Sequence, residues 1–295
     1  MTTLRSPTAR RNGILLLLLS SLCFSTGSTV AKIGLNADVH PISLLTMRYL
    51  LATFILWGVF AVICPAKLRI DRSGLGRCAE AAAAGVASAA CFYFAITVID
   101  VSVATVMVSL YPVVALLMLT RLGERLTRVH MLRLGLAMGG SYLLLGPSGE
   151  VNATGLLLVL GTAFFFALHV TLVQWRLSAY SPHTITVYIT TFMALMTSVI
   201  YLFQIGEFPE LSPTGWGVVL WTGIISTVVA RFTMFAGIQH IGTGQMVLLD
   251  PVETLLAVLW AFMFLGERFS MLQGAGALLI VTSAAFVLRK ESNRL

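Results

Sequence analysis

Three ionisable residues stand out because they lie inside long apolar runs of the second half of the chain: Arg231, Asp250 and Glu253. A charged side chain in a membrane interior costs about 2.5 kcal/mol or more on insertion scales, so such residues mark ligand or proton sites or else pair with one another. Asp250 and Glu253 are three residues apart and share one face of a helix. Two interpretations follow: a site that binds a ligand and protons, or a structural ion pair between neighbouring helices.

We predict that Arg231 pairs with Asp250, because a short Gly-rich segment, 242–244, would join their two helices as antiparallel neighbours. A nearby guanidinium favours the charged carboxylate, whereas burial in an apolar interior favours the protonated form. On this hypothesis Glu253 exchanges a proton while the paired carboxylate stays charged. Glu253 and Asp250 are the predicted proton-coupling residues.

Other polar and aromatic side chains in apolar runs are candidates for the same ligand site. His169 is either a ligand or proton group or a hydrogen-bonded packing residue. Tyr93 and Trp260 are predicted to line an aromatic cavity, although most aromatic side chains in membrane helices simply pack. Arg48, about seven residues into its helix, is not assigned to this site and is expected to pair with a carboxylate.

The composition indicates an all-α integral membrane protein. The chain has 295 residues, of which 58% are hydrophobic and 11% charged, with a mean hydropathy of +0.92. Soluble domains average about 25% charged residues. The apolar runs match helices of about 20 residues that cross a bilayer, and the alternation expected of a membrane barrel is absent. Ten membrane-spanning segments are predicted, at 13–34, 42–64, 77–98, 101–120, 129–146, 153–175, 183–204, 213–239, 243–265 and 270–289.

The positive charges are concentrated in short loops on one side of the predicted bundle. This pattern follows the rule that cytoplasmic loops are positive, so both termini are predicted to face the cytoplasm. It also explains the net charge of +7 without a nucleic-acid partner. Neither the four cysteines nor the histidines have metal-site spacing, and no enzyme signature is present, so no metal, cofactor or catalytic residue is predicted.

An internal repeat organises the chain. The segments 109–125 and 248–268 both end in Leu-Gly-Glu-Arg, and aligning Tyr111 with Glu253 gives an offset of 142 residues (253 − 111). Tyr111 is therefore predicted to face the same cavity as Glu253, unless it is a core tyrosine bonded to a neighbouring helix. The same offset aligns the apolar run after Gly13 with that after Gly155, so the N-terminal run is interpreted as the first helix of a repeat rather than a cleaved signal.

The repeat predicts two halves, 1–146 and 150–295, of five helices each, separated by a turn-rich segment. An odd number of crossings inserts the second half upside down relative to the first. Inverted repeats of this kind are common in secondary transporters, whose substrate sites lie near the bilayer midplane between the repeats.

With these motifs the sequence resembles the ten-helix, EamA-type exporters of the drug/metabolite transporter superfamily. The resemblance covers nearly the whole chain and rests on the small-residue stretch 26–32, on Pro41 with Arg48, on Tyr111-Pro112 with Gly123-Glu124, and on Glu253 with Gly266-Glu267. Two positions depart from the family pattern. Thr26, also a predicted substrate-binding residue, replaces a frequent tryptophan, and Thr254 replaces the proline after the glutamate.

The resemblance implies metabolite export across a bacterial inner membrane. We therefore predict a secondary active exporter of small amphiphilic metabolites, such as amino acids or related compounds, that works by alternating access and is proton-coupled. The alternatives are a passive facilitator, an importer, or a membrane-embedded enzyme. The expected partners are the lipid bilayer and a small-molecule substrate, with the protein a monomer or homodimer.

Overall fold

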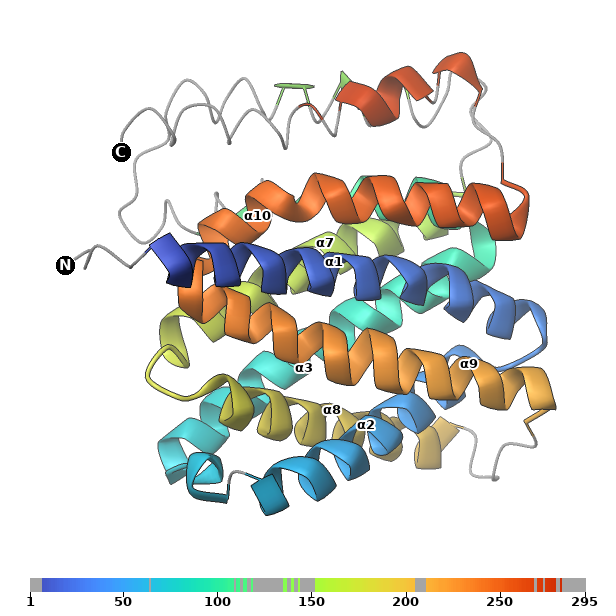
Figure 1. The fold of residues 1–295 in the computed structure, drawn as a ribbon. Helices are drawn as coiled ribbons and strands as arrows, with labels where there is room; N and C mark the ends of the chain where they lie inside the picture. The colour runs from blue at the N-terminus through green and yellow to red at the C-terminus, as the bar shows by residue number, and fades with distance from the viewer. Residues whose placement is uncertain are drawn as a thin grey trace.

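The computed structural model describes residues 7–63, 65–108, 110–111, 114–115, 118, 135–136, 139–140, 143, 152–204, 211–267, 270–272, 274–279 and 282, and only the backbone at 7–10, 242–245 and 247–251. The elements of this part are helical (Figure 1). They are α1 (Pro7–Asn36), α2 (Pro41–Ile63), the short 3-10 helix η1 (Pro65–Leu68), α3 (Arg72–Val98), α4 (Val101–Val108), α7 (Ala153–Arg176), α8 (Pro182–Gln204), α9 (Pro213–Gly223), the π-helix η2 (Ile224–Val229) and α10 (Ala230–Leu265).

The described part contains six apolar helices long enough to cross a membrane, which are Arg11–Asn36, Pro41–Ile63, Arg72–Val98, Ala153–Arg176, Pro182–Gln204 and Pro213–Ile241. These agree with the predicted spans to within a few residues. A shorter apolar helix covers Val252–Leu265. The predicted helix 129–146 lies largely outside the described residues, and the predicted helices 101–120 and 270–289 are described only in part, so the prediction of ten spans stays a prediction.

Local sequence explains where several helices begin. Asp71, Asn152 and Ser212 cap α3, α7 and α9, because each side chain accepts a backbone N–H of the first helical turn. Proline opens α2, α8 and α9, where its missing N–H costs nothing and its fixed φ suits the first helical position. At the other end of α10, Gly266 has φ +68°, the left-handed conformation typical of a helix stop.

The predicted helix 213–239 is interrupted by the π-helix η2 in the middle of its span, which the apolar pattern did not reveal. Hydrogen bonds to the fifth preceding residue replace the usual α-helical ones in a π-turn, and such turns are frequent at functional sites. The side chain of Thr227 supports this register, because its hydroxyl donates to the Thr222 carbonyl at 2.8 Å. The hydroxyl group of Thr227 therefore stabilises the change from α-helical to π-helical pitch at η2.

The chain reverses direction within α10. Ser226 Oγ lies 3.2 Å from the Cys23 carbonyl, and Trp260 Nε1 lies 3.1 Å from Ser25 Oγ, so two residues 34 apart meet the same level of α1. A straight helix would separate them by about 50 Å. The sequence predicted two antiparallel helices, 213–239 and 243–265, joined by a short Gly-rich turn at 242–244. The structure has the two antiparallel legs, and the backbone between them is helical (Figure 1).

Side chains are distributed as expected for a protein in lipid. Large apolar side chains point outward, with Phe54 80% and Phe203 88% exposed. Hydroxyl side chains are buried, and those of Thr197 and Thr222 donate to carbonyls one turn earlier in their own helices. The exposed apolar surface suits lipid tails, and bonds such as those of Thr197 and Thr222 satisfy hydroxyl groups within the bundle, as a membrane environment requires.

Two hydrogen bonds reproduce the internal repeat in three dimensions. Ser20 Oγ donates to the Ala230 carbonyl at 2.9 Å, and Ser88 Oγ donates to the Thr162 carbonyl at 3.1 Å. With the repeat offset of 142, Ser20 is equivalent to Thr162 (20 + 142) and Ser88 is equivalent to Ala230 (88 + 142). The two bonds therefore join equivalent pairs of positions, and each is the repeat-related copy of the other. The first helix of each half thus packs against the third helix of the other half.

The ends of the helices show how the repeats are oriented. Lys32, near the end of α1, donates to the carbonyl of Ile96, near the end of α3. Gly155, near the start of α7, packs against the side chain of Ile99, just beyond α3. The end of α1 and the start of α7 therefore lie at one end of the bundle.

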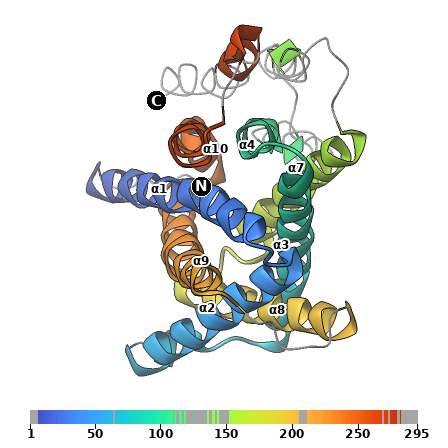
Figure 2. The same ribbon diagram turned by 90° about the vertical axis from the view of Figure 1, so that its right-hand side faces the viewer.

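The opposite end shows the converse arrangement. Gln239 donates to the carbonyl of Tyr180, just beyond α7, while Gly13 near the start of α1 packs against Ile241. The repeat-related helices α1 and α7 therefore run in opposite directions, as an inverted repeat requires (Figure 1). Viewed along the helices, α2 and α8 lie together on one side, α4 and the returning leg of α10 on the other, with the pairs α1/α9 and α3/α7 between them (Figure 2).

Charged residues divide between the two ends of the described bundle. The end at which α1 begins carries mainly bases, which are Arg11, Lys67, Arg69, Arg72, Arg77 and Arg176. The opposite end carries Lys32, Asp38, Asp100 and Glu267. There the Glu267 carboxylate accepts the backbone N–H groups of Val101 and Ser102, each at 2.9 Å, and so caps α4 with a residue that follows α10.

We expect Asp100→Asn to raise the thermal midpoint more at pH 7 than at pH 4. Burial, with Glu267 nearby, raises the pKa of the Asp100 carboxyl above 3.8, and Lys32 opposes this. An acid with a raised pKa in the folded state binds protons more tightly there, so unfolding free energy falls as pH rises from 3.8 through the raised value. Asparagine removes this loss. Midpoints measured across this pH range in detergent check the prediction, and an equal change at both pH values would contradict it.

Asp71 provides a control of opposite sign in another loop. The hydrogen bond from Tyr180 holds the pKa of this carboxyl below its usual value, so its stabilising effect is present at pH 7 and is lost as pH falls. Asp71→Asn should therefore lower the midpoint at pH 7 more than at acidic pH.

Candidate substrate cavity

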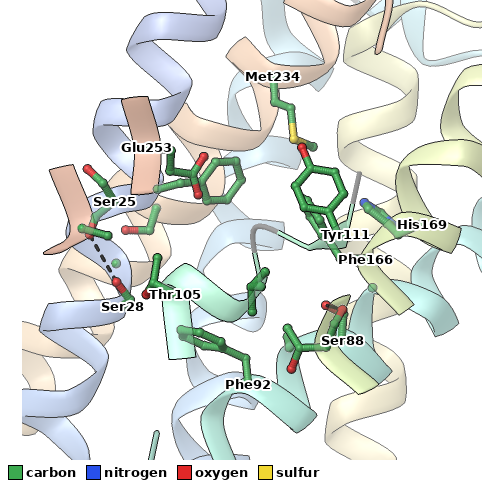
Figure 3. Close-up of a pocket in the computed structure, with 18 of the residues that line it drawn as sticks. Ser25, Ser28, Ser88, Phe92, Thr105, Tyr111, Phe166, His169, Met234 and Glu253 are labelled. Carbon is green, nitrogen blue, oxygen red and sulfur yellow. Dashed lines mark hydrogen bonds between the residues drawn. The ribbon is translucent and has the colours of Figure 1, made fainter. Parts of the chain in front are cut away.

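A cavity of about 180 Å³ lies between the two halves, with walls from α1, α2, α3, α4, α7, η2 and α10 (Figure 3). Its lining combines aromatic and sulfur-containing side chains with hydroxyl groups and a small number of charges. The polar lining residues are Ser25, Ser28, Arg48, Ser88, Tyr93, Thr105, Tyr111, Thr162, His169, Ser226, Arg231, Glu253 and Thr254, and the larger apolar ones are Phe24, Phe92, Phe166, Met234 and Met246.

The cavity follows the internal repeat. Several lining residues form pairs separated by 142 positions, namely Phe24 with Phe166, Gly27 with His169, Ala89 with Arg231, Phe92 with Met234, and Tyr111 with Glu253. Both members of each pair face the same space although their chemistry differs. The cavity therefore lies where the repeats meet, and its two sides present different groups to a ligand.

Arg48 contributes a buried guanidinium from α2. Its Nη1 donates to the Tyr93 hydroxyl, and its Nη2 lies 3.2 Å from the Tyr49 hydroxyl. The guanidinium carbon also lies 4.6 Å from the centre of the Tyr49 ring, within cation–π range. Among the described residues, α2 and α3 supply phenol groups to Arg48, and its predicted pairing with a carboxylate stays a prediction.

Arg231 contributes a second buried guanidinium from the start of α10. Its guanidinium carbon lies 5.7 Å from the centre of the same Tyr49 ring. The side chains of Arg231 and Arg48 are 7% and 8% exposed, and the Nε of each is buried without a hydrogen-bond partner. By contrast, Arg176 at the surface forms a salt bridge with Glu80.

His169 is fully buried in the wall formed by α7. Its Nδ1 lies 2.8 Å from the Ala81 carbonyl, which only accepts hydrogen bonds, so Nδ1 carries the proton. In the neutral ring Nε2 is then an acceptor, and that atom is buried without a partner. Phe166 stacks on the ring at 6.3 Å between centroids and extends the aromatic wall to Tyr111.

Glu253 lies across the cavity from His169 (Figure 3). Ser25 and Ser28 of α1 lie on the Glu253 side, and Tyr111, Phe166 and Met234 lie nearer His169. The arrangement offers donors at two guanidinium groups and acceptors at a carboxyl group and an imidazole. Such a site can hold a small molecule with both an anionic and a cationic end.

Five of the predicted ligand-binding residues come together at this cavity, which are Tyr93, Tyr111, His169, Arg231 and Glu253. Thr26 does not, because its hydroxyl faces α9 and accepts from Trp221 Nε1 at 3.1 Å. Trp260 also lies outside the lining, although it donates to the lining residue Ser25. The side chain of Asp250 lies outside the described residues, so its pairing with Arg231 stays a prediction.

The sequence analysis missed several lining residues, including the hydroxyl groups of Ser25, Ser88 and Thr105. Serines and threonines are common in membrane helices and carry no distinguishing signal. The repeat offset could have found others, because Phe24 and Ala89 align with Phe166 and Arg231. Arg48 was noticed as a buried base but was not assigned to the site.

Comparison with known proteins identifies relatives of both halves. A model of the EamA-like transporter family matches residues 11–146 and again 153–289, which together cover most of the chain. A solved structure described only as "Crystal structure of protein" superposes with a TM-score of 0.68 at 19% identity, covering 97% of this chain and 98% of that one. That likeness concerns the fold.

Two curated proteins of Bacillus subtilis (strain 168) are also similar. "Uncharacterized transporter YwfM" is 28% identical over 137 residues, 46% of each chain. "Uncharacterized transporter YxxF" is 25% identical over 179 residues, 58% of this chain and 56% of its own. The aligned region spans about half the length of each relative.

Proposed function

The chain belongs to the EamA-like transporter family, within the drug/metabolite transporter superfamily, and from this premise we propose that it exports small zwitterionic, partly apolar metabolites such as amino acids. The observation that carries the proposal is the cavity between the repeats, with two guanidinium groups and a carboxyl group in an aromatic lining. Membrane transport of small molecules follows from the family. The cargo, direction and energy coupling are what we propose.

The charges favour a zwitterion over other classes of cargo. Arg48 and Arg231 supply donors for a carboxylate, and Glu253 and His169 supply acceptors for an ammonium group. Phe92 and the other aromatic residues suit an apolar side chain. A quaternary or purely cationic drug would meet two buried positive charges, which like-charge repulsion disfavours.

The size of the cavity supports a small cargo. A cavity of about 150 Å³ holds a molecule the size of benzene, and the space here is about 180 Å³. An amino acid of modest size fits this volume, whereas a nucleotide-sugar does not. The inverted repeat supports alternating access, in which one half rocks against the other around the central site.

We further propose that Glu253 carries the coupled proton. Glu253 lies in the wall of the cavity and is partly buried. A proton and an ammonium group would compete there for the same carboxylate oxygens. Such competition links proton entry to cargo release. A passive facilitator with the same cavity would transport without regard to an imposed pH gradient.

Radiolabelled counterflow in proteoliposomes tests the proposal. Vesicles preloaded with unlabelled leucine, serine, threonine or phenylalanine, in separate preparations, should accumulate trace label of at least one of these amino acids, and vesicles without protein should not. Preloading with a nucleotide-sugar provides the contrasting cargo. Flux of the nucleotide-sugar without flux of any amino acid would overturn the zwitterion assignment, and chemical alteration of the recovered label would favour a membrane enzyme.

We propose that both termini face the cytoplasm of a bacterial inner membrane, because bases gather at the end where α1 begins. Single cysteines at Asp38 and Asp100, in a background lacking the four native cysteines, should react with an impermeant thiol reagent added to intact cells. Cysteines at Arg72 and Arg77 should react only after the membrane is opened. The reverse labelling pattern would overturn the proposed orientation.

A further inference from the structure

We propose that Arg48 and Arg231, held around the ring of Tyr49, form a subsite for the carboxylate of the cargo. This inference rests on the proposed function for the rest of the cargo, but it concerns the anionic end alone. It starts from two buried cations drawn from different halves of the protein that face one aromatic ring. Their partners among the described side chains are the phenols of Tyr49 and Tyr93.

The phenol partners that the described residues supply bring no opposite charge to the two guanidinium groups. Tyr93 and Tyr49 give Arg48 hydrogen bonds and ring faces, but phenols carry no net charge. A buried ion without an opposite charge is several kcal/mol less stable than a paired one. The phenols therefore position Arg48 and leave room for an anion to complete its environment.

Each of the two arginines keeps an Nε–H donor for which the described residues supply no acceptor. Each Nε is buried without a partner, and both residues line the same cavity. A carboxylate binds guanidinium through two parallel N–H···O bonds, which an Nε–Nη edge supplies. A single carboxylate reaching these edges would satisfy the donors and offset the charge, which water or a hydroxyl group does not do.

The position of the subsite also connects it to the π-helix. The Arg48 carbonyl lies close to Gly223, where a Cβ would be 3.3 Å from that oxygen, and η2 begins at the next residue. Arg231 is the second residue of α10, two positions after η2 ends. The backbone of Arg48 thus lies beside the start of η2 and Arg231 follows its end, and an anion bound by both side chains would hold α2 against this segment.

Benzoate and benzamide provide a matched pair of test molecules, because they share size and ring and differ in charge. Binding is measured on the purified full-length protein by titrating each molecule against its thermal midpoint at pH 7.5, in a buffer that contains no other carboxylate. Benzoate should raise the midpoint and benzamide should not. Equal effects of the two molecules, or no effect of benzoate, would overturn the carboxylate subsite.

Substitutions then assign the effect to the two arginines. Arg48→Gln and Arg231→Gln should each weaken benzoate binding roughly 10- to 100-fold, the range expected for a lost charged hydrogen bond. Arg176→Gln removes the same charge at the surface, where Arg176 pairs with Glu80, and should leave benzoate binding unchanged. Unchanged binding in both cavity variants would overturn the proposal.

Arg48→Lys and Arg231→Lys cover the case in which the glutamine variants do not fold. Each keeps the charge but loses the planar edge, so benzoate should bind more weakly than to the parent protein while the fold is retained. Parental affinity in both lysine variants would count against bidentate binding and overturn the subsite as described.

The outcome for the subsite is separable from that for the proposed function. Arginine-dependent benzoate binding without amino-acid counterflow would keep the subsite and move the cargo to carboxylates that lack an ammonium group. Amino-acid counterflow that is unaffected in Arg48→Gln and Arg231→Gln would keep the function and remove the subsite.

Discussion

Glu253→Gln is expected to abolish accumulation of cargo driven by a pH gradient while leaving exchange across the membrane intact. The amide keeps the shape and polarity of the side chain but binds no proton. With one proton moved per cargo molecule, a gradient of one pH unit supports about tenfold accumulation, since about 1.4 kcal/mol corresponds to a factor of ten. The variant should show no accumulation above the equilibrium ratio.

The measurement compares two assays on the same proteoliposomes, once the counterflow experiment has named a transported amino acid. Counterflow without a pH gradient reports exchange, and uptake against an imposed gradient reports coupling. Glu80→Gln is the matched control, because Glu80 is an exposed acid that pairs with Arg176 at the surface. If Glu253→Gln accumulates cargo as well as the parent, Glu253 has a structural role and the proton coupling lies elsewhere.

Gly27→Val is expected to remove transport and to lower the thermal midpoint by several degrees. A Cβ at this position would lie 2.6 Å from Ser226 Oγ and 2.8 Å from Ser226 Cβ, closer than packed atoms can approach. Overpacking of this kind costs roughly 1–3 kcal/mol. Gly27 also lines the cavity of about 180 Å³, so the added methyl groups reduce the space available to cargo.

Gly217→Val separates this effect from the general consequences of placing valine in a membrane helix. Gly217 lies in α9, and a Cβ at this position would meet no atom of the described residues within 4 Å, so valine there points into open space. Counterflow rate and thermal midpoint of Gly217→Val should match the parent. A Gly27→Val protein with parental rate and midpoint would show that α1 and η2 separate freely, contrary to the packing described.

Much of the architecture was predictable because the membrane imposes it. The bilayer sets helix length and requires every backbone group to be satisfied within a helix, so apolar runs located α1, α2, α3, α7 and α8 to within a few residues. The repeat, visible as an offset of 142, predicted that Tyr111 and Glu253 would face one cavity. The predicted residues Arg231, His169 and Tyr93 lie at the same cavity because polar groups in apolar helices avoid lipid.

Other features depended on contacts between distant segments. Nothing in the apolar pattern distinguishes the π-turn at 224–229 from an ordinary helix, since the segment is apolar or hydroxyl-bearing throughout and the difference lies in the hydrogen-bond register. Thr26 and Trp260 lie outside the lining because helix rotation, set by packing against α9 and α1, directs their side chains to neighbouring helices.

The sequence by itself determined that the protein is a membrane-embedded helical duplication with ionisable groups in its interior, because bilayer thickness and the cost of burying charge act on each segment separately. Only the tertiary structure decided which of those groups meet. Arg48 lies 183 residues before Arg231 (231 − 48), and their approach to one Tyr49 ring follows from the packing of α2 against α9 and η2, directly before α10. Such packing is set by whole helices, to which any single segment contributes only in part.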